Sequence, residues 1–353
     1  MEKDFHFNTV YALARAAGFG PDNAKIAAYA SQHTDDAKYH HTLEFENGGR
    51  FQQTLTAHQF LAAGAISKDT SYTIYVPFHF IPGNHGVDFY ERMYTRPNSI
   101  IAQRVVNDFL QMPLKPYSLH LLGIILHLYA DTWSHQNFMG VEREHMNDVK
   151  DLKVIDEEAG WFEKVCGDLK GRICEYAFPM LGHAQAGTLP DEPYREWEYY
   201  DYRDRHHTIF NHERAMDAAQ NCCAVLTRFL KQYPQFAESA SVPWQDFSGK
   251  VSMLFGEKGT VEERCERWQA AISGGGFNFS PTDEDKTLRY DDREWFRSAV
   301  EVIKDEQDSK KPDIYERKIG FEVSNWKCFH DAASYHIFHA LHEVLPEYGI
   351  ICG

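Results

Sequence analysis

The sequence lacks several features that would place the protein in a particular compartment. Its seven cysteines are odd in number and include no CxxC pair, which fits reduced, mostly structural thiols. No segment approaches the ~20 apolar residues of a membrane span. Charges also interrupt the opening MEKDFHFNTVYALARAAGF where a signal peptide needs its apolar region. We therefore expect a cytoplasmic protein without a membrane span.

Positive charge is also scarce. Lysine and arginine number 36 against 52 aspartate and glutamate residues, so the formal net charge is -16 at pH 7. Such a surface disfavours nonspecific binding to duplex nucleic acid or to an anionic membrane. We expect a small-molecule or phosphoester substrate instead, because a metal cluster can reverse the sign of the potential locally at a pocket.

The patterns that are present predict a mainly α fold. With 43% hydrophobic and 14% aromatic residues the chain should be globular and ordered. A hairpin is expected around Asn47-Gly48, and an extended segment at 70–83. Helical patterns dominate from about residue 100, at 100–111, 117–137, 141–149, 155–176, 207–231, 247–256, 260–272, 291–305 and 323–345.

These elements suggest a multi-helix globular fold around a buried central metal-binding helix, with minor β-hairpin additions. We expect a single mainly α domain over residues 1–353. Its core would be 1–235, and the helical extension 236–353 would be either part of that core or a subdomain.

The stretch Leu119–Gly140 combines a helix of core composition with ionisable side chains. At about 100° per residue, His120, His127, Asp131 and His135 share one stripe of the helix. A buried carboxylate between imidazoles needs a partner, and i, i+4 spacing lets two side chains converge on one ion. The H-x3-D-x3-H spacing of His127, Asp131 and His135 therefore predicts metal binding. The alternative is that these histidines form hydrogen bonds with carbonyl groups of the core. His120 is about 10 Å from His127 along the axis and is expected to be structural.

Further ligand candidates lie in loops and at the ends of elements. His6 follows Asp4 in the alternating opening D-F-H-F, which places both side chains on one face if that segment is extended. Asp35 and Asp36 lie at the C-terminal end of a helix predicted from residue 22, where the helix dipole disfavours acids. His79 lies between aromatic residues in PFHFIPG. Each has an ordinary alternative, as a solvated terminus, an exposed helix end or a packing residue.

Two downstream segments carry additional candidates. His183 and Asp191 lie in GHAQAGTLPDEP, which either joins the metal shell or forms a capping loop. The pair His330-Asp331 resembles the signature dipeptide of the HD phosphohydrolases. The apolar residues of the same helix recur at helical spacing and give it a sufficient packing role.

The order of the upstream motifs resembles the zinc-dependent phospholipase C and S1/P1 nuclease superfamily over roughly residues 4–140. The similar parts are His6 before a V-x-x-L-A helix, the acidic pair in ASQHTDDA, PFHFIP, and a buried H-x3-D helix with another histidine shortly after. Over most of its length the chain more closely resembles a bacterial family of unknown function. That similarity rests on DFH, DDA, PFHFIPG, HxYADTWSHQxFxG and GHxxxxxxPDxP.

The superfamily resemblance implies an all-α fold that holds up to three zinc ions for phosphoester hydrolysis. The ligands it implies are His6, Asp35, His79, His127, Asp131 and His135, with Asp35 also able to serve as general base. Asp36, His183 and Asp191 remain further metal candidates.

The chain departs from the superfamily pattern in two respects. Those relatives are secreted and use the amine of an N-terminal Trp as a ligand, whereas this chain has Met1 and no export signal. His135 also follows Asp131 sooner than in the superfamily. A site of one or two ions, rather than three, is therefore the expectation.

Taken together, these observations predict a metal-dependent hydrolase of phosphoesters, with Asp35 accepting a proton from a metal-activated water. The oligomeric state is not indicated. The alternatives are a non-catalytic, metal-stabilised binding or scaffold protein, and an HD-type phosphohydrolase that uses His330 and Asp331.

Overall fold

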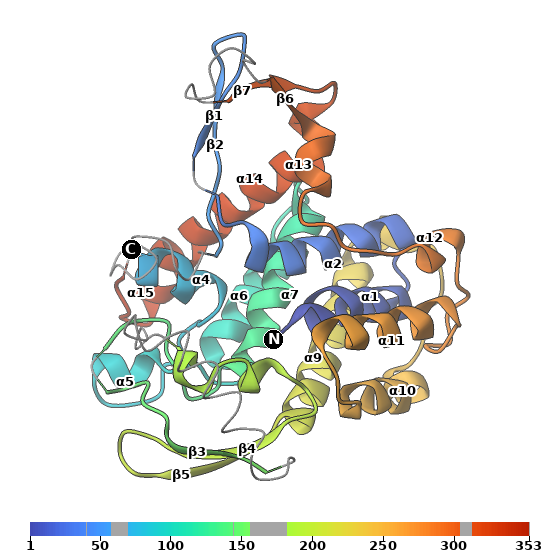
Figure 1. Ribbon diagram of the computed structural model, residues 1–353. Coiled ribbons are helices and arrows are strands. Elements are labelled where there is room, and N and C mark those ends of the chain that lie inside the picture. Colours follow the sequence, from blue (N-terminus) through green and yellow to red (C-terminus); the bar gives the residue numbers. More distant parts are fainter. Residues whose placement is uncertain (40, 58–69, 144, 156–181, 304–312, 353) are drawn as a thin grey trace.

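A computed structural model describes residues 1–353 except 40, 58–69, 144, 156–181, 304–312 and 353 (Figure 1). The described residues form a mainly α fold with small antiparallel sheets, which confirms the predicted class. The first sheet pairs β1 (Thr42–Glu44) with β2 (Arg50–Gln52), the second has β4 (Glu196–Tyr200) between β3 (Lys150–Val154) and β5 (His206–Phe210), and the third pairs β6 (Val300–Ile303) with β7 (Ile314–Arg317). The β1–β2 and β6–β7 hairpins lie together at one end of the molecule, and the three-stranded sheet lies at the other (Figure 1).

A buried helix runs through the centre of the structure. This helix, α7 (Ser118–Ser134), has all its residues buried, as its nearly continuous apolar composition requires. The helices packed against it are α2 (Pro21–Asp36), α6 (Ile100–Gln111), α9 (Asn211–Gln232) and α14 (Asn325–Phe338), and α1 (Val10–Ala17) packs against α2 and α9 (Figure 1). The predicted central helix is thus confirmed.

Shorter helices complete the fold. Before α9 these are the π-helix η1 (Asp4–Thr9), the π-helix η2 (Ser71–Tyr75), α4 (Val76–Phe78), α5 (Phe89–Met93), and the 3-10 helices η3 (Ala184–Ala186) and η4 (Leu189–Asp191). Beyond α9 they are η5 (Pro234–Phe236), α10 (Trp244–Gly256), α11 (Val261–Ser273), α12 (Asp283–Lys286), α13 (Glu294–Ala299), η6 (Phe321–Val323), η7 (His339–Val344) and α15 (Leu345–Glu347). Among the described residues, no helix has both the length and the apolar content that crossing a membrane requires.

One segment expected to be extended is helical. Most of the 70–83 segment forms η2 and α4. This prediction was wrong because a short apolar run in a buried environment does not distinguish a strand from a helix. The opening D-F-H-F belongs to η1, so the condition for Asp4 and His6 to share one face, an extended segment, is not met and the two side chains point in different directions.

Several predicted helix boundaries also differ from the structure. Residues 206–210 pair with β4, so the helix expected over 207–231 begins only at Asn211. The helix expected over 291–305 ends at Ala299, where β6 begins, and none of the described residues of 141–149 is helical. The helix expected over 155–176 lies, apart from residue 155, outside the described residues.

One continuous cluster of buried apolar side chains joins the N-terminal, central and C-terminal helices. A smaller cluster lies under the three-stranded sheet and includes Phe80, Phe138, Trp197, Tyr199 and Ile209. The second cluster packs beside the end of α7, which places the loop before β4 near the ionisable residues of that helix.

The crossing of α2 over α7 depends on the absence of a side chain at Gly123. A Cβ there would overlap the carbonyl oxygen of Ala27 and lie 2.6 Å from the Cβ of Ala30. Since α2 ends at Asp35 and Asp36, this crossing sets where those carboxylates lie relative to α7.

We expect Gly123→Ala to lower the free energy of unfolding by roughly 2 kcal/mol, because overpacking forces the two helices apart. Gly249→Ala is the matched control, since its position in α10 has nothing within 4 Å of the added Cβ. It should be neutral or stabilising by up to about 1 kcal/mol, because alanine has the higher helix propensity. Urea denaturation measures both, and equal effects would contradict the packing argument.

Candidate metal centre

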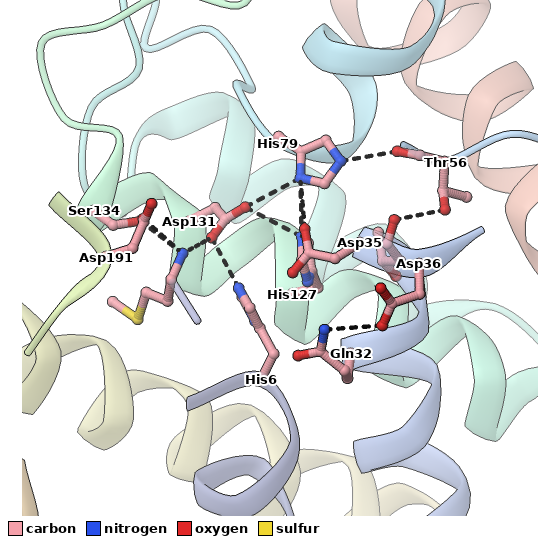
Figure 2. Close-up of polar contacts among 12 residues, drawn as sticks. His6, Gln32, Asp35, Asp36, Thr56, His79, His127, Asp131, Ser134 and Asp191 are labelled. Atoms are coloured by element: carbon pink, nitrogen blue, oxygen red, sulfur yellow. Dashed lines mark hydrogen bonds and ion pairs between the residues drawn. The ribbon is translucent and has the colours of Figure 1, made fainter. Parts of the chain in front are cut away.

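The site is built around the buried carboxylate of Asp131, which is 1% exposed. Its Oδ1 lies 2.8 Å from the α-amino nitrogen of Met1 and 3.1 Å from Nε2 of His6. Its Oδ2 lies 3.2 Å from Nε2 of His127 and 3.4 Å from Nδ1 of His79 (Figure 2). Four separate groups, from three parts of the chain, therefore meet at one side chain.

Ligand-type atoms within 4.8 Å of one another fall into three groups in the described structure. The groups are His6, His127 and Asp131; Asp35, His79 and His127; and His135, His183 and Asp191. The first two share His127. The third is connected to them through Asp131, whose Oδ2 is 3.7 Å from Nδ1 of His135.

The secondary structure explains how these side chains converge. His127 and Asp131 are one turn apart on α7, and His135 is the residue at which α7 ends. The π-helix η1 supplies His6, the last turn of α2 supplies Asp35, and the end of α4 supplies His79 (Figure 2). Residues 182–195, which contain η3 and η4, supply His183 and Asp191.

Backbone carbonyls orient three of the histidines. Nε2 of His79 donates to the carbonyl of Thr56 at 2.8 Å, and Nδ1 of His135 donates to the carbonyl of His79 at 2.8 Å. Nδ1 of His183 donates to the carbonyl of Gly187 at 3.0 Å. A neutral imidazole has one proton, so each ring presents an unprotonated nitrogen to the site. Metal-ligating histidines typically donate their other ring N–H to a backbone carbonyl in this way.

The imidazole nitrogens and carboxylate oxygens that face one another in these groups are the kinds of atom that bind a divalent cation. In the third group, Nε2 of His135 and of His183 lie 3.5 and 3.4 Å from the carboxylate of Asp191. A lone pair facing a carboxylate is repulsive unless a proton or a cation lies between them. Imidazole nitrogen and carboxylate oxygen are ligands that zinc prefers, so the residues present fit this metal.

Burial and the neighbouring charges shift the pKa values of the site in opposite directions. Burial favours neutral Asp131, yet the Met1 ammonium and the histidines hold the pKa of its carboxyl well below the usual range. Burial likewise opposes the Met1 ammonium, but Asp131 and Asp191 raise its pKa to about 11. Burial raises the pKa of Asp35, and it lowers that of His183 to about 4. Asp131 is therefore a charged carboxylate while His6 and His183 are neutral imidazoles, a combination that suits cation binding.

The structure separates some predicted candidates from this centre. Asp36 belongs to none of the three groups, and its carboxylate accepts hydrogen bonds from Gln32, Lys38 and Tyr290 instead. Consecutive residues on a helix point about 100° apart, so both acids of the pair cannot face one site. Figure 2 shows Asp36 turned toward Gln32, away from Asp131.

The HD pair also lies outside the centre. Nδ1 of His330 accepts a hydrogen bond from the backbone of Thr54, and Asp331 pairs with Lys327. Neither residue is part of a metal-ligand group in the described structure. Although Met1 stands where the superfamily has Trp, the Met1 amine lies beside Asp131. The buried side chains of Phe5 and Phe7 anchor this segment.

The chain matches the model of a known protein family. A family model described as "Family of unknown function (DUF6765)" matches residues 1–344. The chain belongs to this family. No curated protein and no solved structure matches the chain. Every candidate ligand lies within the segment that the family model matches.

His120 shares the helix stripe but not the site. It is 4% exposed, Nε2 lies 3.0 Å from Oδ1 of Asn325, and its ring meets Trp295 edge-on. Burial lowers the pKa of His120 to about 4. Because the folded pKa lies below the unfolded value, the unfolded chain binds more protons between these two values. The stabilising contribution is thus present above about pH 6.5 and is lost as the pH falls toward 4.

His120→Gln should therefore make stability less sensitive to acid. Between pH 7 and pH 5 the unmodified protein should lose on the order of 2 kcal/mol more unfolding free energy than the variant. Thermal or urea unfolding at the two pH values measures this, with the exposed His85→Gln as control. An equal loss of unfolding free energy in the unmodified protein and in both variants would show that the pKa of His120 is not lowered as inferred.

Proposed function

We propose that this protein is a metal-dependent phosphoester hydrolase whose centre holds zinc ions. The observation that carries the proposal is the convergence of the Met1 amine and four histidines on the buried Asp131 carboxylate. Isolated buried carboxylates are costly, and a centre of this composition is compensated best by a divalent cation. The order of the motifs, which resembles the zinc-dependent phospholipase C and S1/P1 nuclease superfamily, supports the same reading.

The arrangement favours a catalytic centre over a closed structural one. The histidines of the Asp35 group are buried, whereas the side chain of Asp35 is 33% exposed. The group is therefore open to solvent on the Asp35 side, as catalytic zinc sites require. Nε2 of His127 faces both Asp131 and Asp35, so it would ligate one ion for these two groups, and His135, His183 and Asp191 would hold a second. Sites of two ions are common among phosphatases and nucleases.

The residues of the chain have distinct roles in this proposal. His127, Asp131 and the other ligands hold the ions, while the hydrogen bonds of His79, His135 and His183 to carbonyls keep their rings oriented. Bound zinc would lower the pKa of a water molecule and neutralise charge on phosphate oxygens. Asp35, at the open side, would accept the proton of the attacking water.

Metal analysis tests the first part of the proposal. Purified protein should contain zinc at one to three ions per chain, and His127→Ala and Asp131→Asn should each lower that content. Removing the metal with a chelator should lower the stability of the unmodified protein by roughly 3–4 kcal/mol at saturating zinc, because a ligand bound only to the folded state stabilises it. The exposed His85→Ala provides the control. Protein without bound metal would overturn the proposal.

Substitution of the two neighbouring acids, Asp35 and Asp36, tests the catalytic part of the proposal. Asp35→Asn should lower phosphoester hydrolysis by about 100-fold or more, because a general base contributes that much. Asp36→Asn, one residue along the chain but bonded to Gln32 and Tyr290, should stay within about threefold of the unmodified rate. A panel of phosphomonoesters and phosphodiesters provides the assay. Stoichiometric zinc without turnover of any substrate would indicate a structural metal site instead.

A further inference from the structure

One arginine from the C-terminal part of the chain fastens the N-terminal segment that leads to His6. Arg264 lies in the first turn of α11 and is 2% exposed. Its Nε donates to the carboxylate of Asp4 at 2.8 Å, Nη2 donates to the carboxylate of Glu2, and Nη1 donates to the carbonyl of Gly259 at 2.7 Å. All three guanidinium nitrogens thus have partners, and two of them hold the residues just before His6.

These contacts determine where η1 begins. The backbone N–H groups of Phe5 and His6 both donate to the carbonyl of Glu2, at 2.9 and 3.0 Å. The π-helical conformation is uncommon and depends on its tertiary surroundings. By fixing the side chains of Glu2 and Asp4, Arg264 fixes the start of this helix and hence the direction of the His6 ring.

Arg264 also touches the second segment that reaches the centre. Its guanidinium lies 5.6 Å from the centre of the Tyr194 ring. The Tyr194 hydroxyl donates to Glu192 at 2.7 Å, next to the candidate ligand Asp191. One buried side chain therefore contacts both the segment with His6 and the segment with Asp191.

We propose that Arg264 is a positioning residue of the metal centre, which holds the His6 and Asp191 segments in place without touching the ions. The metal part of this inference rests on the proposed function. A purely structural arginine would instead contribute to stability without any specific connection to His6.

A second buried ion pair in the same chain serves as the control. Arg15 is 4% exposed and donates to the carboxylate of Asp285 at 2.9 and 3.0 Å. This pair links α1 to α12 and contacts no candidate ligand. Arg15→Met and Arg264→Met therefore remove comparable buried charges, one beside the centre and one away from it.

Zinc retention against a competing chelator distinguishes the two roles. Arg264→Met should lower zinc affinity by roughly tenfold or more, as should His6→Ala, and the double variant should lose less than the sum of the two single losses because both changes act in part through His6. Arg15→Met should lower thermal stability but leave zinc affinity within about twofold. Equal zinc loss in the two methionine variants, or additive loss in the double variant, would overturn the proposal.

A measurement without metal keeps the two proposals separate. In chelator-treated protein, the amides of residues 5–9 should exchange with solvent at least about tenfold faster in Arg264→Met than in Arg15→Met, with Arg264→Lys between them. Unchanged exchange would refute the role of Arg264. If Arg264→Met fails to fold, Asp4→Asn removes the same contact and is compared in the same way. Unmodified protein that binds no zinc would overturn the proposed function, and exchange alone would then decide the role of Arg264.

Discussion

The buried carboxylate of Asp131 is the constraint on which the rest of the structure depends. Its helix is apolar on nearly every side, so its charge has no access to water and must be compensated within the protein. The compensation comes from groups far apart in sequence, from Met1 and His6 at one end of the chain to His79 and His135. Each of these groups needs an element to position it, and much of the fold supplies those elements.

Close packing between helices determines which acid joins the centre. Because Gly123 has no side chain, α2 approaches α7 closely enough for Asp35 to face the histidines. The next residue, Asp36, is rotated away and forms part of a separate network with Gln32 and Tyr290. A single close crossing therefore separates two chemically identical neighbours into a candidate proton acceptor and a structural residue.

The C-terminal part of the chain supplies no residue to the three ligand groups of the described structure, yet it supports them. Arg264 fastens the N-terminal segment, and Phe255 stacks on Phe5 at a ring separation of 5.7 Å. Asn325 and Trp295 surround His120 at the other end of the central helix. Residues from most of the segment that the family model matches therefore support the candidate centre.

The sequence by itself determined the local features. The mainly α class, the buried central helix and the placement of His127 and Asp131 one turn apart follow from periodicity, which acts over a few residues. Only the tertiary structure decided which distant groups meet Asp131. It alone revealed the Met1 amine, the π-helical turn at His6, the exclusion of Asp36 and the contacts of Arg264. The physical reason is that local spacing sets the face of a helix on which a side chain lies. The meeting of two faces depends on packing contacts between segments more than a hundred residues apart, and these leave no local pattern in the sequence.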